Sequence, residues 1–302
     1  MAHHHHHHDH HEHSVKQFNA AFICAIVLNL IFVVIEVIYA RLTNSTSLLA
    51  DAGHNLGDVL GLLMSWAALL LLAKKATDKY SYGFKRTTIL AAFANAILLI
   101  ATTMIIFYEA IQKILHPVII QEMQVIVVAA IGIMVNGGTA LLFAKGQHDL
   151  NIKAAFLHLA YDALISFGVV VSGFIIIWTH WYLLDALAGL VIGLFIFYGT
   201  WSLMRQSLNL IMDAVPSNID IAAVTNFLKN YPGVYEVHHV HIWGLSTKEA
   251  ALTAHIIFPS GITDAILREI HQQLAHKFHI NHATLQVEQG GMPGNPHSCE
   301  CP

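Results

Sequence analysis

Two pairs of ionisable residues with the same spacing lie inside hydrophobic stretches of the chain. They are His54 with Asp58 and His158 with Asp162. Residues four apart share one face of a helix, so each pair places an imidazole and a carboxylate side by side. Two such helices facing each other would supply two nitrogens and two oxygens, a ligand set that suits tetrahedral zinc. Because ionisable groups are costly at membrane depth and usually mark an ion pathway, the pairs predict that the chain moves a divalent metal across a membrane.

The residues around the first pair also fit a metal site. Asp51 lies on the same helical stripe as this pair, and Asn55 lies beside it. We interpret these two side chains as a possible gate or as a support for the ligands. Gly53 and Gly57 are four apart, which lets a neighbouring helix approach closely. A close approach matters because zinc bonds of about 2 Å leave little slack.

The composition is that of a polytopic membrane protein. Of 302 residues, 56% are hydrophobic and only 11% are charged, whereas soluble domains carry about 25% charged residues. The net charge of −4 gives no reason to expect a nucleic acid as a partner. Three cysteines are too few for a disulfide framework.

Apolar runs of roughly 20 residues, the length that crosses a hydrocarbon core, predict six transmembrane helices embedded in lipid. The expected spans are 17–40, 47–73, 84–114, 121–144, 152–179 and 183–207. Nine lysines and arginines fall on one side of these helices and only Arg41 and Lys113 on the other, so both termini are expected in the cytoplasm. Since no cleavable targeting peptide is visible, we expect a bacterial inner membrane.

The sequence becomes more polar after residue 210. Helical patterns over 219–230 and 263–278 alternate with strand patterns over 234–244, 250–258 and 282–288. The order αββαβ predicts a small α+β domain with its helices on one face of the sheet. The expected organisation is a histidine-rich tail, a six-helix transmembrane domain, this cytoplasmic domain and a short final tail, over 1–16, 17–210, 211–290 and 291–302.

The two tails contain further candidate ligands. Nine histidines fall among the first thirteen residues, and they are either an expression tag or a tail that collects metal. The final tail carries Cys299 and Cys301, whose spacing is unusual for zinc but whose thiols are zinc ligands.

Four stretches of the chain resemble the cation diffusion facilitator family, in particular its zinc-transporter branch. These stretches are 47–58, 82–90, 151–162 and 238–243, and the resemblance covers nearly the whole chain. It implies a homodimer of six-helix protomers with a ferredoxin-like cytoplasmic domain, exporting zinc in exchange for protons. It also implies that His54, Asp58, His158 and Asp162 form the transport site. In this family, histidine at the first of these positions is associated with zinc selectivity over cadmium.

The cytoplasmic histidines form a second group of candidate ligands. Strict strand alternation would put His239 and His241 on one face of the sheet and His238 on the other. The family resemblance suggests a regulatory zinc ion bound by His255, His282 and Glu288, with the rest of the cluster nearby. The full candidate set is His238, His241, His255, His282, Glu288, Cys299 and Cys301.

The leading hypothesis is a proton-coupled antiporter and not an enzyme. Zinc needs neutral imidazoles and ionised carboxylates, so zinc and protons compete for the same groups. A membrane metalloenzyme is one alternative, but a closed set of four ligands lacks the open coordination position that catalysis needs. A metal sensor or buffer is another, but it leaves the two intramembrane pairs unexplained. Ligand type favours zinc and leaves cadmium, cobalt, iron and manganese open.

Overall fold

The computed structural model describes residues 27–143 and 150–289, and the contacts within the chain divide these residues into two compact units. One unit contains residues 27–63 and 95–201. The other contains residues 64–94 and 202–289.

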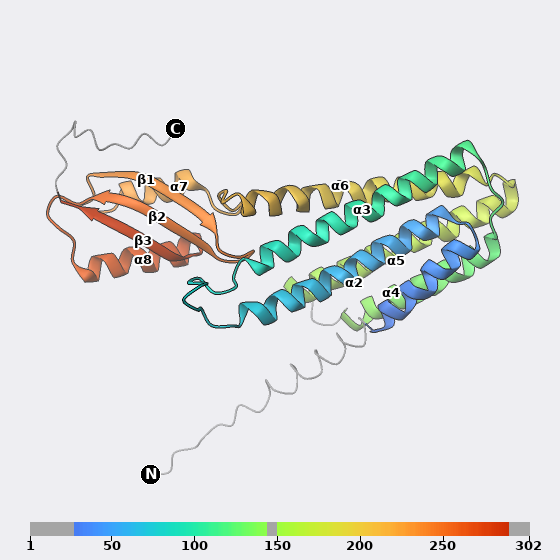
Figure 1. Ribbon diagram of the computed structural model, residues 1–302, viewed down its shortest axis with the longest axis horizontal. Helices are drawn as coiled ribbons and strands as arrows, with labels where there is room; N and C mark the ends of the chain where they lie inside the picture. The colour runs from blue at the N-terminus through green and yellow to red at the C-terminus, as the bar shows by residue number, and fades with distance from the viewer. Residues whose placement is uncertain (1–26, 144–149, 290–302) are drawn as a thin grey trace, which may run out of the picture. The chain divides into compact units, whose positions relative to one another are not determined.

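Five helices in the described part of the chain are long and apolar enough to cross a membrane (Figure 1). A further helix, over residues 27–42, precedes them and lies within the first expected span. This arrangement confirms the prediction of a multi-pass membrane protein. The five helices are α2 Thr46–Leu72, α3 Thr87–Leu115, α4 Glu122–Phe143, α5 Leu150–Thr179 and α6 Leu183–Ile211.

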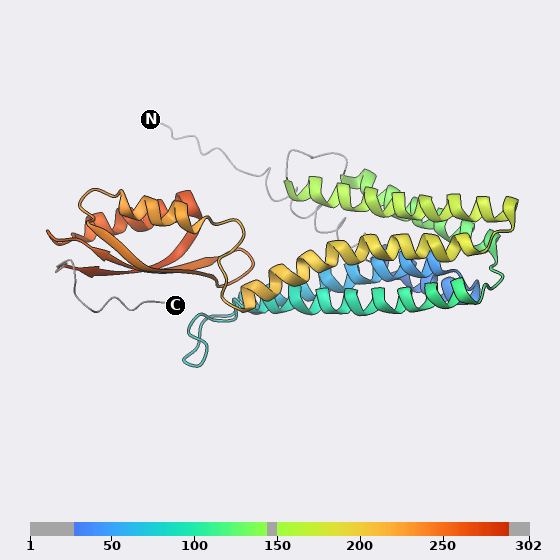
Figure 2. The same ribbon diagram turned by 90° about the horizontal axis from the view of Figure 1, so that it is seen from above.

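Gly53 and Gly57 of α2 lie against α3. A Cβ atom added at Gly57 would lie 1.9 Å from Cδ2 of Leu99, and one added at Gly53 would lie 3.0 Å from Cγ2 of Thr102. The missing side chains therefore let α3 approach the stretch of α2 that carries His54, as small residues do at membrane helix interfaces. Elsewhere in this unit, α4 packs along α5, as Figures 1 and 2 both show.

The start of α2 is held by a carboxylate from α6. Asp185 is buried and accepts hydrogen bonds from the hydroxyl groups of Ser45 and Ser47, at 2.6 and 2.5 Å, and from the backbone N–H of Thr46. The first N–H groups of a helix have no partner within the helix, so a carboxylate placed there satisfies them and caps the helix. Asp185 therefore fixes one end of α2 against α6.

The second unit contains a small α+β domain built on a three-stranded sheet. Strand β1 (Glu236–Gly244) pairs antiparallel with β2 (Ala250–Ile257), and β2 pairs in parallel with β3 (Ile280–Glu288). Helix α7 (Ile221–Lys229) precedes β1, and α8 (Asp264–Phe278) connects β2 to β3. Both helices cover the same face of the sheet (Figure 2). The predicted αββαβ order is confirmed.

The core of this domain lies between its helices and its sheet. Leu228 of α7 and Leu274 of α8 are fully buried and belong to one cluster with Leu252 of β2. Burying a side chain of this size stabilises a fold by about 1.5–3 kcal/mol. The helices begin at capping side chains, because Asp220 accepts from the N–H of Ala222 and Thr263 accepts from that of Ile266.

Candidate metal sites

The structure brings the two predicted intramembrane pairs together into one ring. Between the helices, Nε2 of His54 on α2 lies 3.2 Å from Oδ1 of Asp162 on α5, and Nε2 of His158 lies 3.4 Å from Oδ2 of Asp58. Within each helix, the imidazole nitrogen and the carboxylate oxygen are 3.6 and 3.7 Å apart. Each imidazole therefore lies between both carboxylates. The Asp162 side chain is only 5% exposed, while that of His158 is 48% exposed.

The size of this ring suits a tetrahedral ion. With bonds of about 2 Å, the ligand atoms around a tetrahedral zinc ion lie about 3.3 Å apart, and the four nitrogen–oxygen separations bracket this value. The buried Oδ2 atom of Asp58 accepts no hydrogen bond of good geometry, and the imidazole nitrogens of His158 and His54 lie 3.4 and 3.6 Å from it. A buried carboxylate oxygen without a hydrogen-bond donor is unfavourable unless a positive charge faces it. The ring is therefore complementary to a divalent cation.

Asp51 and Asn55 lie behind the ring in a buried chain of hydrogen bonds. The hydroxyl group of Ser166 on α5 donates to Oδ2 of Asp51 at 2.6 Å. The amide nitrogen of Asn55 donates to Oε2 of Glu36 at 3.0 Å and lies 3.5 Å from Oδ1 of Asp51. This chain connects the helix over residues 27–42 to α2 and α5. The roles expected for Asp51 and Asn55, as a gate or as a support for the ligands, both stay predictions.

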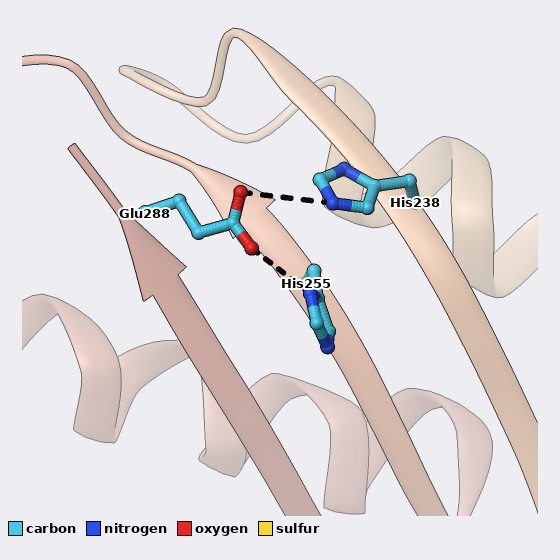
Figure 3. Close-up of side chains that lie close together, drawn as sticks. All are labelled: His238, His255 and Glu288. Carbon is cyan, nitrogen blue, oxygen red and sulfur yellow. Dashed lines mark hydrogen bonds and ion pairs between the residues drawn. The ribbon is translucent and has the colours of Figure 1, made fainter. Parts of the chain in front are cut away.

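Three cytoplasmic side chains converge from three neighbouring strands (Figure 3). Nδ1 of His255 on β2 lies 2.9 Å from Oε1 of Glu288 on β3, and Nε2 of His238 on β1 lies 3.7 Å from Oε2 of the same carboxylate. The register explains the meeting, because His238 pairs with His255 across β1 and β2. One ligand atom from each residue lies within 4.8 Å of the other two. Two imidazoles and a carboxylate at this spacing fit a zinc ion.

A bulge in β1 adds a histidine that strand alternation had assigned to the opposite face. The register of β1 shifts between His238 and His241, and His239 has a positive φ of 51°. This local break in the pleat brings three imidazole rings together, since the rings of His238 and His239 lie 5.2 and 5.0 Å from that of His255. The expectation of strict alternation at His238 and His239 is therefore wrong. Two adjacent histidines were the only hint in the sequence.

The structure does not bring the other expected cytoplasmic ligands to this cluster. His241 is exposed beyond the bulge, in a hollow that it shares with Val215 and Trp243. His282 lies near the start of β3, where its ring is 5.3 Å from that of Tyr82. Glu288 is six positions further along β3, which is about 20 Å of extended chain. Cys299, Cys301 and the histidines of the first tail lie outside the described residues.

Comparisons with known proteins identify the family. Residues 22–212 match the model described as the cation efflux transmembrane domain, and residues 216–290 match that of the cation efflux protein cytoplasmic domain. The chain belongs to the cation efflux family, that is, the cation diffusion facilitators. The resemblance drawn from the four sequence stretches is confirmed. This cation efflux protein is accordingly a multi-pass membrane transporter of metal cations.

Several curated relatives match over most of their length. The chain is 35% identical over 289 residues to the metal cation efflux system protein CzcD of Cupriavidus metallidurans, covering 95% of this chain and 89% of the relative. It is 33% identical over the same shares to the zinc transporter ZitB of Pectobacterium atrosepticum. It is also 33% identical to a cadmium, cobalt and zinc/H(+)-K(+) antiporter of Bacillus subtilis, covering 85% of each chain.

One solved structure also matches part of this cation efflux protein. It is the metal-bound C-terminal domain of the CzcD transporter from Cupriavidus metallidurans, at 38% sequence identity and a TM-score of 0.22. The match covers 23% of this chain and 99% of that domain.

Proposed function

We propose that this protein exports Zn²⁺ from the cytoplasm in exchange for protons, by alternating access of one site formed by His54, Asp58, His158 and Asp162. The closed ring in which each imidazole faces both carboxylates is the observation that carries this proposal. Membership of the cation efflux family and the zinc transporters among the relatives support it.

Protons exchange with zinc because both bind the same atoms. An imidazole coordinates zinc only when it is neutral, and a carboxylate does so when it is ionised. A protonated imidazole in this ring would instead form ion pairs with the carboxylates of Asp58 and Asp162, which already lie within 3.7 Å of its Nε2 atom. Protons arriving from the far side of the membrane therefore favour release of the metal there.

Alternating access requires the metal site to open first to one side of the membrane and then to the other. The helices α2 and α5, which carry the site, must therefore move. Each of α2 and α5 contributes one nitrogen and one oxygen, so neither helix alone completes the ligand set. Because each helix supplies half of the ligands, moving the helices apart breaks the ligand set. The affinity for zinc therefore depends on the distance between α2 and α5. Zinc binding thus favours the arrangement in which both helices face the ion.

The cytoplasmic cluster is the proposed site of a resident regulatory zinc ion. The imidazoles of His238 and His255 would hold it together with the carboxylate of Glu288, and His239 lies close enough to join them. Bound zinc would tie β1, β2 and β3 together at one end of the sheet. We further propose that this domain mediates a homodimer, as the resemblance implies.

The cellular setting follows from the loop charges and from the relatives. The excess of lysine and arginine on one side supports cytoplasmic termini, and the bacterial relatives support a bacterial inner membrane. A relative named for cadmium, cobalt and zinc supports a substrate range wider than zinc alone. Iron and manganese remain further candidates, because ligand type alone does not decide metal choice in a cell.

Zinc flux in reconstituted vesicles tests the proposal against a metalloenzyme or a metal buffer. Purified protein in vesicles with an imposed pH gradient is expected to accumulate zinc, and both Asp58→Ala and Asp162→Ala are expected to abolish this flux. Asp78→Asn, in an exposed turn between α2 and α3, is the control and should retain it. Flux that survives both ring substitutions would refute the site. Flux that ignores the gradient would refute the proton coupling.

A further inference from the structure

Glu36 is a buried acid that the four-residue ring does not use. It lies on the helix over residues 27–42 with no solvent exposure, and its Oε1 atom has no hydrogen-bond donor. Asp185, equally deep in the same unit, has hydroxyl and backbone N–H donors on its carboxylate. Donors of this kind allow a buried carboxylate to stay ionised, and Glu36 has far fewer of them.

Glu36 shares its hydrogen-bond donor with another acid. The amide nitrogen of Asn55 lies within 3.5 Å of both Oε2 of Glu36 and Oδ1 of Asp51, so one donor serves two carboxyl groups. The shared donor thus holds the two carboxyl groups near each other. The remaining oxygen of Asp51 accepts from Ser166.

The charged groups around this pair are also mostly acidic. Among the described residues, the charged side chains whose electric field reaches Glu36 are those of Asp51 on α2 and Asp162 on α5. His54, one helical turn further along α2, acts on Asp51. In the described part of the chain, no ion pair joins Glu36 to a lysine or an arginine. Two ionised carboxylates at such close range repel each other, and a proton shared between them removes the repulsion.

We infer that Glu36 and Asp51 form a proton-binding site separate from the four zinc ligands, and that Glu36 releases its proton when Zn²⁺ enters the ring. This inference rests on the proposed exchange of zinc for protons. In the absence of metal, Glu36 carries the one proton of this pair and Asp51 carries the negative charge. The positive charge of a zinc ion beside His54 favours the ionised form of the pair, because an opposite charge stabilises a carboxylate. The proton therefore leaves Glu36, and it returns when the metal departs.

The geometry also explains how the two sites communicate. Asn55 follows His54 directly in α2, and its side chain holds Glu36 and Asp51 together. Ser166, one turn beyond Asp162 on α5, holds Asp51 from the other side. The same two helices thus carry the zinc ligands and the partners of the proton-binding pair. Movement of α2 relative to α5 changes both sites at once.

Infrared difference spectroscopy of the full-length protein in detergent tests this site directly. The wild type is expected to show a protonated-carboxyl C=O band that disappears when Zn²⁺ is added. Glu36→Gln is expected to lack this change, since glutamine keeps a donor toward Asp51 but has no acid proton. Glu109→Gln, which removes a carboxylate paired with Arg41, is the matched control and should keep the change. The inference would be overturned by a wild-type band that persists with zinc. It would also be overturned if Glu36→Gln kept the change and Glu109→Gln lost it.

Proton release on zinc binding gives a second readout. With a pH dye in weak buffer, Glu36→Gln should release about one proton fewer per zinc bound than the wild type. Equal release in the two proteins would overturn the inference and would leave the transport site intact. The proposed function fails separately, through zinc flux that survives Asp58→Ala and Asp162→Ala.

Discussion

His54 on α2 and Asp162 on α5 stand 108 residues apart in the chain, yet Nε2 of one lies 3.2 Å from Oδ1 of the other. This contact crosses between the helices and is shorter than either contact within a helix. The ring is thus closed by helix packing and not by local spacing alone. A change in the distance between α2 and α5 must open it, which links metal affinity to the arrangement of the helices.

Zinc affinity should rise with pH and should depend strongly on the closing carboxylate. A proton bound to an imidazole nitrogen occupies the lone pair that zinc needs, so lowering the pH weakens binding by up to about tenfold per pH unit for each proton displaced. Asp162→Asn should weaken binding by about 100-fold or more at pH 7, because even groups that merely orient a ligand contribute 10–100-fold. Calorimetric titration of the purified protein measures both effects.

Asp78→Asn is the control for this experiment, because Asp78 is exposed in the turn after α2. Its affinity and its pH profile should match those of the wild type. An Asp162→Asn protein with unchanged affinity would show that the ring does not bind the metal. An affinity independent of pH would show that protons do not compete for it.

The cytoplasmic cluster should account for part of the bound metal. Glu288→Gln and His255→Ala should each lower the zinc content of the purified protein by about one ion per chain, since a site of few ligands loses most of its affinity with one of them. Mass spectrometry of the metal content measures this. His282→Ala is the matched control, because His282 lies at the other end of β3. A loss of metal on changing His282, with none on changing Glu288, would contradict the cluster.

The ring of two histidines and two aspartates was predictable from the sequence because it depends on helical spacing. His54 and Asp58 share a helix face whatever the helices pack against, and so do His158 and Asp162. The link from Glu36 through Asn55 to Asp51 was not predictable, since the hydrogen bond between Asn55 and Glu36 depends on how the helix over residues 27–42 packs on α2. The position of His239 beside His255 was not predicted for a different reason. A bulge in β1 interrupts the alternation of side chains between the two faces of the sheet, and no pattern in the sequence predicts this bulge.

Loss of the Asp185 carboxylate should destabilise the start of α2. Asp185→Ala leaves the hydroxyl groups of Ser45 and Ser47 and the N–H of Thr46 without this acceptor in a buried place. We expect a loss of about 2–4 kcal/mol in the free energy of unfolding, which combines the loss of a cap with unpaired buried donors. Thermal unfolding in detergent, followed by fluorescence, measures it.

The control for this substitution is Asp185→Asn, which keeps one oxygen acceptor at the same place. Its loss of stability should be clearly smaller than that of Asp185→Ala. Equal losses would mean that the negative charge matters more than the acceptor. No loss in either protein would show that the contacts at the start of α2 contribute little to stability.

A side chain at Gly57 should destabilise the packing of α2 against α3. In Gly57→Ala, the new Cβ atom would overlap Cδ2 of Leu99 at 1.9 Å, so we expect a loss of about 1–3 kcal/mol of stability and weaker zinc flux, because Asp58 is adjacent. Gly137→Ala on α4 is the control. Its Cβ atom meets nothing within 4 Å, and alanine favours a helix over glycine. A Gly57→Ala protein as stable as Gly137→Ala would refute the close approach of α3.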